Sequence, residues 1–199
     1  MADRIILASG SEIRQRLLRN AGVDFDVTVP KVDESSVKAS LLGEGAPPRD
    51  VADALADLKA RRVASREADA LVLGCDQVLA FKDTIFSKPG STNEARLQLR
   101  QLRNKRHSLL SAAVIYEDGA PVWRHVGEVR LTMRDFSDDY LDEYIERNWE
   151  SIRHSVGAYK IEEEGARLFS RIDGDYFNVL GLPLIEVLSY LTLRGTLPQ

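Results

Sequence analysis

The chain has 199 residues, 44% of them hydrophobic and 29% charged, with a formal net charge of −4. This composition is typical of a globular protein with one domain or two closely packed lobes, and it argues against binding to long nucleic acid, which needs a basic surface. No apolar stretch approaches the ~20 residues that cross a bilayer, an early strand leaves no room for a secretory leader, and the single Cys75 cannot form an internal disulfide, so we expect a cytoplasmic protein.

Hydrophobic periodicity and turn residues predict alternating strands and helices without repeats or linkers. We therefore expect one mixed α/β domain over residues 1–199. In chain order, the predicted elements are a strand at 4–8, a helix at 12–21, a strand at 25–30, loops at 32–36 and 43–48, a helix at 49–67, a strand at 70–81, a helix at 91–102, strands at 107–116 and 122–133, a helix at 137–147, a loop at 154–165, a turn at 173–175 and a helix at 183–193.

An acidic residue, Asp76, lies in the middle of the apolar run at 70–81. Such a run is typical of a strand buried on both faces, where an ionised carboxylate is costly without partners. Burial raises the pKa of a carboxyl group and a nearby cation lowers it, so Asp76 could be adjusted to act as a general base. A carboxylate that only caps a loop at the strand end is the alternative.

The Ser9-Gly10-Ser11 turn between the first strand and the first helix is a candidate anion site. A helix start offers unpaired backbone N–H groups, the two serines add hydroxyl donors, and Arg14 adds a guanidinium suited to phosphate oxygens. A plain serine N-cap beside a surface arginine explains the same residues without a ligand.

Further candidate groups are individually weak. Lys59 and Lys88 are candidate cations, and Pro89 restricts the backbone of Lys88 to an extended form. Asp33 and Glu34 are either metal ligands or general bases, or they form a solvated turn or helix cap.

For three other features of the sequence we favour a structural role over a catalytic one. His107 is either a general acid or a structural histidine, and we favour the second. The acidic run at 162–164 indicates a solvated surface, and we expect Cys75 to be buried and inert.

Several motifs follow one another over nearly the whole chain. They are residues 7–11 with Arg14, 32–35, 55–60 with Lys59, 74–76, 88–89, His107, 157–159 and Gly174-Asp175-Tyr176-Phe177-Asn178-Val179-Leu180-Gly181-Leu182-Pro183. Taken together, these motifs resemble the Maf family, and their order and spacing carry the resemblance more than any one of them does.

The resemblance implies a two-lobed α/β fold around a cleft, with a mixed central sheet like that of inosine triphosphatases. It also implies hydrolysis of a nucleoside triphosphate between its α and β phosphates, a Mg²⁺ or Mn²⁺ cofactor, and a homodimer as one expected state. Such hydrolysis needs a base, cations and phosphate donors. The implied base or metal-holding carboxylate is Asp76, the second metal or water ligand is Glu34, and the implied phosphate ligands are Lys59, Lys88, Arg14, Ser9 and Ser11.

Departures from the family pattern bear on the substrate. With Gln77 and Glu162, the chain resembles the family members directed at 7-methylguanosine triphosphate. Members directed at dTTP or UTP tend to carry Thr at the first of these positions and Gln at the second. A carboxylate suits methylated guanine because it accepts from ring N–H groups and attracts the positive ring. Ile13 replaces the tryptophan of those members, so dTTP or UTP remains the alternative substrate.

One consequence can be checked against a structure. In a regular strand Asp76 and Gln77 point to opposite faces, and both can line one pocket only where the strand is irregular. We therefore expect the strand to bend or end just after Asp76.

Two departures from the family pattern suggest another alternative, a weakly active nucleotide-binding regulator of cell division. The chain lacks the second arginine that the family often carries after its second serine, and its His154-Ser155 segment is unusual. A generic α/β hydrolase is excluded because no Gly-x-Ser-x-Gly motif is present.

Overall fold

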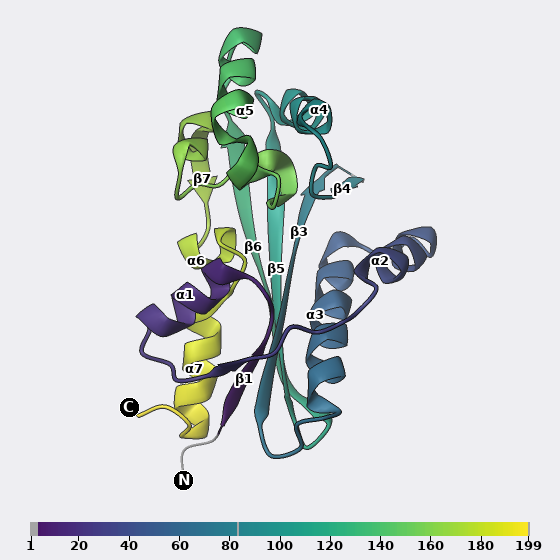
Figure 1. Ribbon diagram of the computed structural model, residues 1–199, viewed down its shortest axis with the longest axis vertical. Coiled ribbons are helices and arrows are strands. Elements are labelled where there is room, and N and C mark those ends of the chain that lie inside the picture. The colour runs from purple at the N-terminus through teal and green to yellow at the C-terminus, as the bar shows by residue number, and fades with distance from the viewer. Residues whose placement is uncertain (1–3, 83, 199) are drawn as a thin grey trace. The chain divides into compact units, whose positions relative to one another are not determined.

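A computed structural model describes residues 4–82 and 84–198 of the chain (Figure 1). Helices and strands alternate along much of it, as the periodicity predicts. The elements are β1 (Ile5–Ala8), α1 (Glu12–Asn20), β2 (Asp26–Val27), α2 (Glu34–Gly43), α3 (Pro48–Ala64), β3 (Leu71–Phe81), β4 (Thr84–Phe86), α4 (Thr92–Leu102), β5 (Arg106–Glu117), β6 (Ala120–Met133), α5 (Asp138–Ile152), η1 (Val156–Ala158), η2 (Glu164–Leu168), β7 (Phe169–Asp173), α6 (Tyr176–Val179) and α7 (Leu184–Arg194).

The strands form one mixed sheet, with the hydrogen-bonded order β2-β1-β3-β5-β6-β7 and β4 paired to β3. The chain divides into two compact units: the first comprises residues 1–77, 110–127 and 176–199, and the second comprises residues 78–109 and 128–175. Strands β3, β5 and β6 contribute residues to both units. The predicted mixed α/β class with a central sheet flanked by helices is therefore confirmed.

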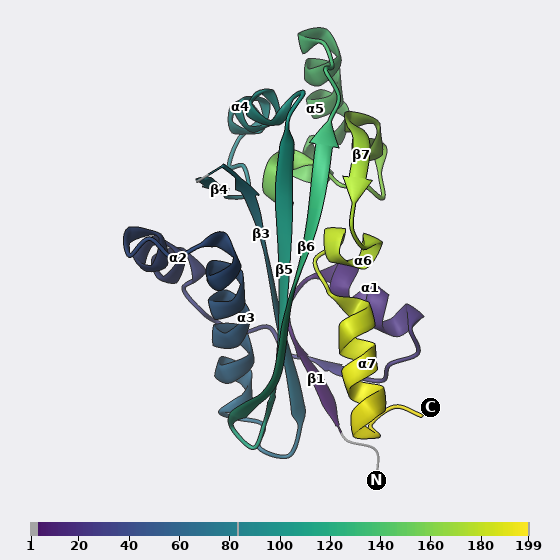
Figure 2. The same cartoon turned by 180° about the vertical axis from the view of Figure 1, so that it is seen from behind.

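In the first unit, parallel pairing joins β1 to β2 and to β3, with Ile5 opposite Leu71 and Ala8 opposite Gly74. Helix α3 lies on one side of these strands, and α1 and α7 lie on the other (Figures 1 and 2). Because both faces are covered, β1 is buried along its whole length and needs no polar face.

In the second unit, antiparallel pairing joins β4 to β3 and β7 to β6. Helix α4 packs against α5. The predicted helix starts are confirmed, since Ser91 accepts a hydrogen bond from the backbone N–H of Glu94 and Ser137 accepts one from Tyr140. In the first unit, a turn at Asp118 and Gly119, both with a positive φ, joins β5 to β6.

Several local predictions differ from the structure. The loop predicted at 32–36 is mostly the first turn of α2, with Asp33 at its N-cap accepting a hydrogen bond from the backbone N–H of Ser36 at 3.1 Å. The strand predicted at 25–30 shrinks to Asp26–Val27, and the loop at 154–165 contains 3₁₀ turns. Helix α2 has no buried residue, so it lacks the apolar periodicity by which helices are recognised.

No helix in the described ranges 4–82 and 84–198 is long and apolar enough to span a membrane.

Candidate active site

One lysine holds two carboxylates together in the first unit. The Nζ atom of Lys59 lies 2.5 Å from Oδ1 of Asp76 and 3.0 Å from Oε2 of Glu34. The side chains of Lys59 and Asp76 are each only 9% exposed, whereas that of Glu34 is 51% exposed. The cluster therefore extends from a buried ion pair to a carboxylate that water and ligands can reach.

The close packing of α3 on β3 produces this cluster. Gly74 lies two residues before Asp76, and a Cβ atom there would lie 2.6 Å from the backbone nitrogen of Ala60 and closer still to the carbonyl oxygen of Ala56. Only glycine allows the helix backbone to approach the strand this closely. Lys59 precedes Ala60 on α3, so the same contact brings its side chain to Asp76.

Burial raises the pKa of Asp76, and the positive charges of Lys59 and Arg14 oppose that shift. An ion pair removed from water stabilises a fold little, because the loss of hydration offsets the mutual attraction. A raised pKa at a buried, paired carboxylate is instead typical of a functional group. This environment suits the predicted role of Asp76 as a base.

Sequence reasoning missed Lys38 on α2. It lies one helical turn after Glu34, so both side chains share a face of the helix. Burial lowers the pKa of Lys38, and the negative charge of Asp76 raises it, so the electrostatic influence of Asp76 reaches this lysine. The spacing from Glu34 is the signal that would have selected Lys38, but only once residues 34–43 were recognised as a helix.

The Ser-Gly-Ser turn is built around the hydroxyl of Ser9, which is 5% exposed. This oxygen accepts from the backbone N–H of Ser11 at 3.2 Å and from Nη1 of Arg14 at 3.3 Å. Ser11 occupies the N-cap position of α1, but its side chain makes no capping hydrogen bond. The turn is therefore more than a serine cap, and its hydroxyls lie beside a guanidinium.

Arg14 is held by more partners than a surface arginine would be. Its Nε donates to the carbonyl oxygen of Gly181 at 2.7 Å, and its Nη1 donates to that of Cys75 at 3.0 Å. Arg14 therefore lies next to the residue that precedes Asp76. In the described part of the chain, no hydrogen bond uses its Nη2 atom, which leaves that nitrogen for a ligand.

The strand does not end after Asp76 as one form of the prediction requires, because β3 continues through Gln77 for four further residues. Gln77 uses its amide nitrogen to donate to Oγ of Ser111 at 2.9 Å and to the carbonyl oxygens of Asn178 and Val179 at 2.9 and 3.1 Å. Strand alternation therefore holds, and the Gln77 amide nitrogen is engaged by protein partners.

The remaining predicted residues belong to the second unit. Lys88 is exposed in the segment between β4 and α4, and Glu162 is exposed between η1 and η2. Of the acidic run, Glu164 accepts hydrogen bonds from Arg147 and Asn148, which lower its pKa to about 2. The run is therefore only partly a solvated surface.

His107 is buried in the second unit, where its ring packs beside Tyr159 and Phe169. Its Nε2 lies 2.8 Å from the hydroxyl oxygen of Tyr159, and burial lowers its pKa to about 4. A neutral histidine in an aromatic core fits the structural role that we favour. Cys75 is also buried, and burial raises the pKa of its thiol to about 11, which fits the expected inert side chain.

The burial of His107 gives the fold an expected acid sensitivity. Its pKa in the folded state, about 4, lies below the ordinary value of 6.5, so its contribution to stability is complete above pH 6.5 and is lost as the pH falls towards 4. The lost free energy of unfolding would be about 3 kcal/mol. Urea titrations between pH 7 and pH 4 should show a smaller pH dependence for His107→Gln than for the wild type. The exposed His154→Gln variant is the control, and an equal slope for all three proteins would contradict the prediction.

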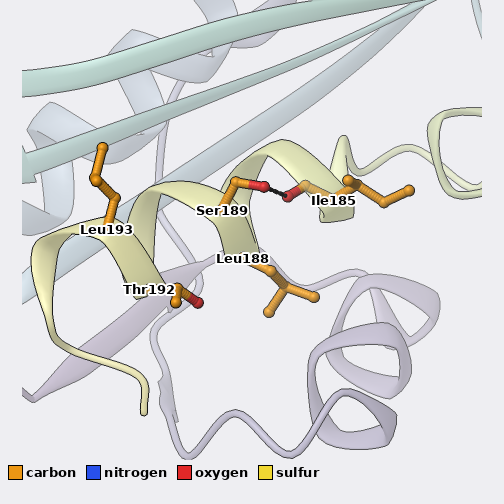
Figure 3. Close-up of a pocket in the computed structure, with 5 residues that line it drawn as sticks. All are labelled: Ile185, Leu188, Ser189, Thr192 and Leu193. Atoms are coloured by element: carbon orange, nitrogen blue, oxygen red, sulfur yellow. Dashed lines mark hydrogen bonds between the residues drawn. The ribbon is translucent and has the colours of Figure 1, made fainter. Parts of the chain in front are cut away.

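An apolar pocket of about 460 Å³ lies along α7 (Figure 3). No lining residue is titratable, and the hydroxyl of Ser189 donates to the carbonyl oxygen of Ile185 at 2.7 Å. The pocket therefore offers no general acid or base. It is lined by Ile185, Leu188, Ser189, Thr192 and Leu193.

The carboxylates fit one common mode of metal binding. Within the described residues, no cluster of three or more His, Cys, Asp or Glu side chains could form a complete metal cage. Mg²⁺ is commonly bound by one or two carboxylates together with substrate phosphates and water. Asp76 and Glu34 suit that mode, because Lys59 engages one oxygen of each.

Comparison with known proteins agrees with the resemblance of the sequence motifs to the Maf family. A protein from Ruegeria sp. (strain TM1040), named nucleoside triphosphate pyrophosphatase, is 61% identical over 199 residues, covering 100% of both chains. Proteins of the same name from Ruegeria pomeroyi and Caulobacter vibrioides are 63% and 49% identical, covering 99% and 97% of this chain and 99% and 96% of their own. The family model described as Maf-like protein matches residues 4–193. The chain therefore belongs to the Maf-like protein family.

Proposed function

We propose that this protein is a nucleoside triphosphate pyrophosphatase, a hydrolase that cuts between the α and β phosphates and releases a nucleoside monophosphate and pyrophosphate. The observation that carries the proposal is the buried Asp76 carboxylate, held at 2.5 Å by Lys59 beside the more exposed Glu34. Relatives up to 63% identical over nearly their whole length bear this enzyme's name. We treat residues 1–199 as one functional domain, since the family model spans residues 4–193.

In this proposal Asp76 orients the attacking water and accepts its proton. Lys59 and Arg14 offset the negative charge of the phosphates, and the Ser9–Ser11 turn donates hydrogen bonds to them. In the alternative role of Asp76 as a metal-holding carboxylate, Asp76 and Glu34 would hold a divalent metal ion, which when bound supplies further positive charge against the phosphates.

Other functional predictions rest on the sequence resemblance. These are phosphate binding by Lys88, a homodimeric state and a cytoplasmic location.

We further propose a preference for 7-methylguanosine triphosphate, with dTTP or UTP as the alternative substrate. The main support for this preference is Glu162, an exposed carboxylate. It can accept hydrogen bonds from guanine N–H groups and attract a positively charged ring. Gln77 supports it less, because the Gln77 amide nitrogen donates to protein oxygens.

A substrate panel tests activity and preference together. Purified protein with Mg²⁺ or Mn²⁺ should convert 7-methyl-GTP to the monophosphate and pyrophosphate faster than dTTP, UTP, GTP, CTP or ATP, and chelation with EDTA should stop turnover. Glu162→Gln should lower turnover of 7-methyl-GTP about 10-fold relative to UTP, because a charged hydrogen bond is lost. The exposed Glu150→Gln is the matched control. Chromatography identifies the products.

The outcomes separate the hypotheses. Equal rates on 7-methyl-GTP and UTP would overturn the base preference while leaving the enzyme intact. Nucleotide binding with no turnover of any substrate would overturn the enzyme and support the weakly active regulator.

A further inference from the structure

One face of β5 and β6 is open in the second unit. Along these strands Arg106 and Arg130 are exposed, whereas the neighbouring His107, Val129 and Leu131 are buried. Figure 2 shows the segments of β5 and β6 in this unit with no helix in front of them. A sheet face that meets water carries polar side chains, so exposure explains their polarity but not an excess of one sign of charge.

A pocket of about 310 Å³ opens on this face. Of the six described residues that line it, three are lysine or arginine and none is acidic. The whole chain has a formal net charge of −4, so this positive charge is a local concentration. The pocket is lined by Ala80, Lys82, Arg106, His107, Ser108 and Arg130.

Two of the three cations keep an uncompensated charge. Among the residues that the structure describes, neither Lys82 nor Arg106 forms an ion pair. The Nζ atom of Lys82 instead lies 5.5 Å from the centre of the Phe81 ring. Unpaired cations beside a concave surface attract anions to it.

Glu128 holds the third cation, Arg130. Its Oε1 atom accepts from Nε of Arg130 at 3.1 Å and from the hydroxyl of Ser108 at 2.8 Å, and its Oε2 atom accepts from Nη2 of Arg130 at 3.4 Å. Within the described part of the chain, no hydrogen bond uses Nη1 of Arg130. Three cations against one carboxylate leave two net positive charges at the pocket.

We propose that this pocket is a binding site for inorganic pyrophosphate, separate from the residues of the proposed active site. A planar guanidinium matches a pair of phosphate oxygens, and two uncompensated cations match an anion with two phosphate groups. No lining residue in the described chain offers an exposed aromatic ring on which a base could stack, which favours an inorganic anion over a nucleotide. None of the six residues is a proposed substrate ligand, so the inference does not depend on the proposed function.

Equilibrium dialysis with radiolabelled pyrophosphate tests the site by counting bound anions. The wild type should bind one more pyrophosphate per chain than Arg106→Gln, in which the affinity of this site should fall about 10-fold or more because a charged hydrogen bond is lost. Lys82→Gln, a second exposed position, should have the same effect. The matched control is Arg171→Gln on β7, which removes the same charge from an exposed arginine paired with Asp173 outside the pocket, and it should bind like the wild type.

Glu128→Gln should have the opposite effect. It removes the carboxylate that competes for Arg130 and Ser108, so pyrophosphate should bind about 2- to 5-fold more tightly, as the loss of an exposed ion pair allows. In backbone amide NMR spectra, pyrophosphate should shift the signals of Ser108 and Arg130 in the wild type and leave them in place in Arg106→Gln. An unchanged or lower affinity in Glu128→Gln would contradict a site that uses these two residues.

The outcomes keep this inference apart from the proposed function. If no nucleotide is hydrolysed but Arg106→Gln still binds one pyrophosphate fewer, the proposed function fails and the site stands. If Arg106→Gln and the wild type bind pyrophosphate in equal number and with equal affinity, the site is overturned whatever the turnover. Equal affinities for pyrophosphate, phosphate and sulfate at matched ionic strength would also overturn it, because they would indicate only diffuse attraction of anions.

Discussion

Asp76→Asn should lower kcat by about 10²- to 10⁴-fold or more while changing KM little, because a positioned general base contributes roughly that factor to the rate. Asparagine keeps the size of the side chain but cannot accept a proton from water. Lys59 keeps Glu34 as its partner in the variant. Burial raises the pKa of Asp76, so removing this carboxylate should leave thermal stability at pH 7 unchanged or improved.

Single-turnover and steady-state kinetics at several pH values would measure this. For the wild type, kcat/KM should decline as the pH falls through a pKa above the ordinary value of 3.8, since the base is active only when ionised. Asp24→Asn, at an exposed position after α1, is the matched control. If Asp76→Asn retains more than about a tenth of the wild-type kcat, a loss below the smallest effect typical of a base, another group activates the water.

Gly74→Ala should damage both the fold of the first unit and its proposed catalytic centre. The added methyl group would lie 2.6 Å from the backbone nitrogen of Ala60, which real contacts do not allow, so α3 must move away from β3. Overpacking of this kind costs about 1–3 kcal/mol, and often more against rigid backbone. Because Lys59 is adjacent to Ala60, the displacement should also weaken the Lys59–Asp76 contact and reduce kcat about 10-fold or more, as 1.4 kcal/mol of lost stabilisation would.

Urea unfolding and steady-state kinetics of the same samples would show whether the two effects occur together. Gly43→Ala, at the end of α2, is the control, because a Cβ atom there meets nothing within 4 Å. That variant should keep full activity and match or exceed the wild type in stability, since alanine favours a helix over glycine. A folded, fully active Gly74→Ala variant would show that α3 does not need its close approach to β3.

The sequence by itself determined the elements whose signals are local. The apolar run around Asp76 predicted β3 and the burial of its carboxylate, and the spacing of apolar residues predicted α3, which carries Lys59. Serine N-caps marked α4 and α5 because a cap satisfies N–H groups two or three residues away. Motif resemblance added the family, which the family model confirms.

Only the tertiary structure decided which distant groups meet. The hydrophobic periodicity of α1 does not predict that Arg14 forms a hydrogen bond with Gly181, which is 167 residues further along the chain. The same holds for Gln77, whose partners on α6 follow from how β3, β5 and α6 pack and not from its own neighbours. Local patterns report backbone geometry and burial, whereas hydrogen-bond partners depend on the surfaces that folding brings into contact.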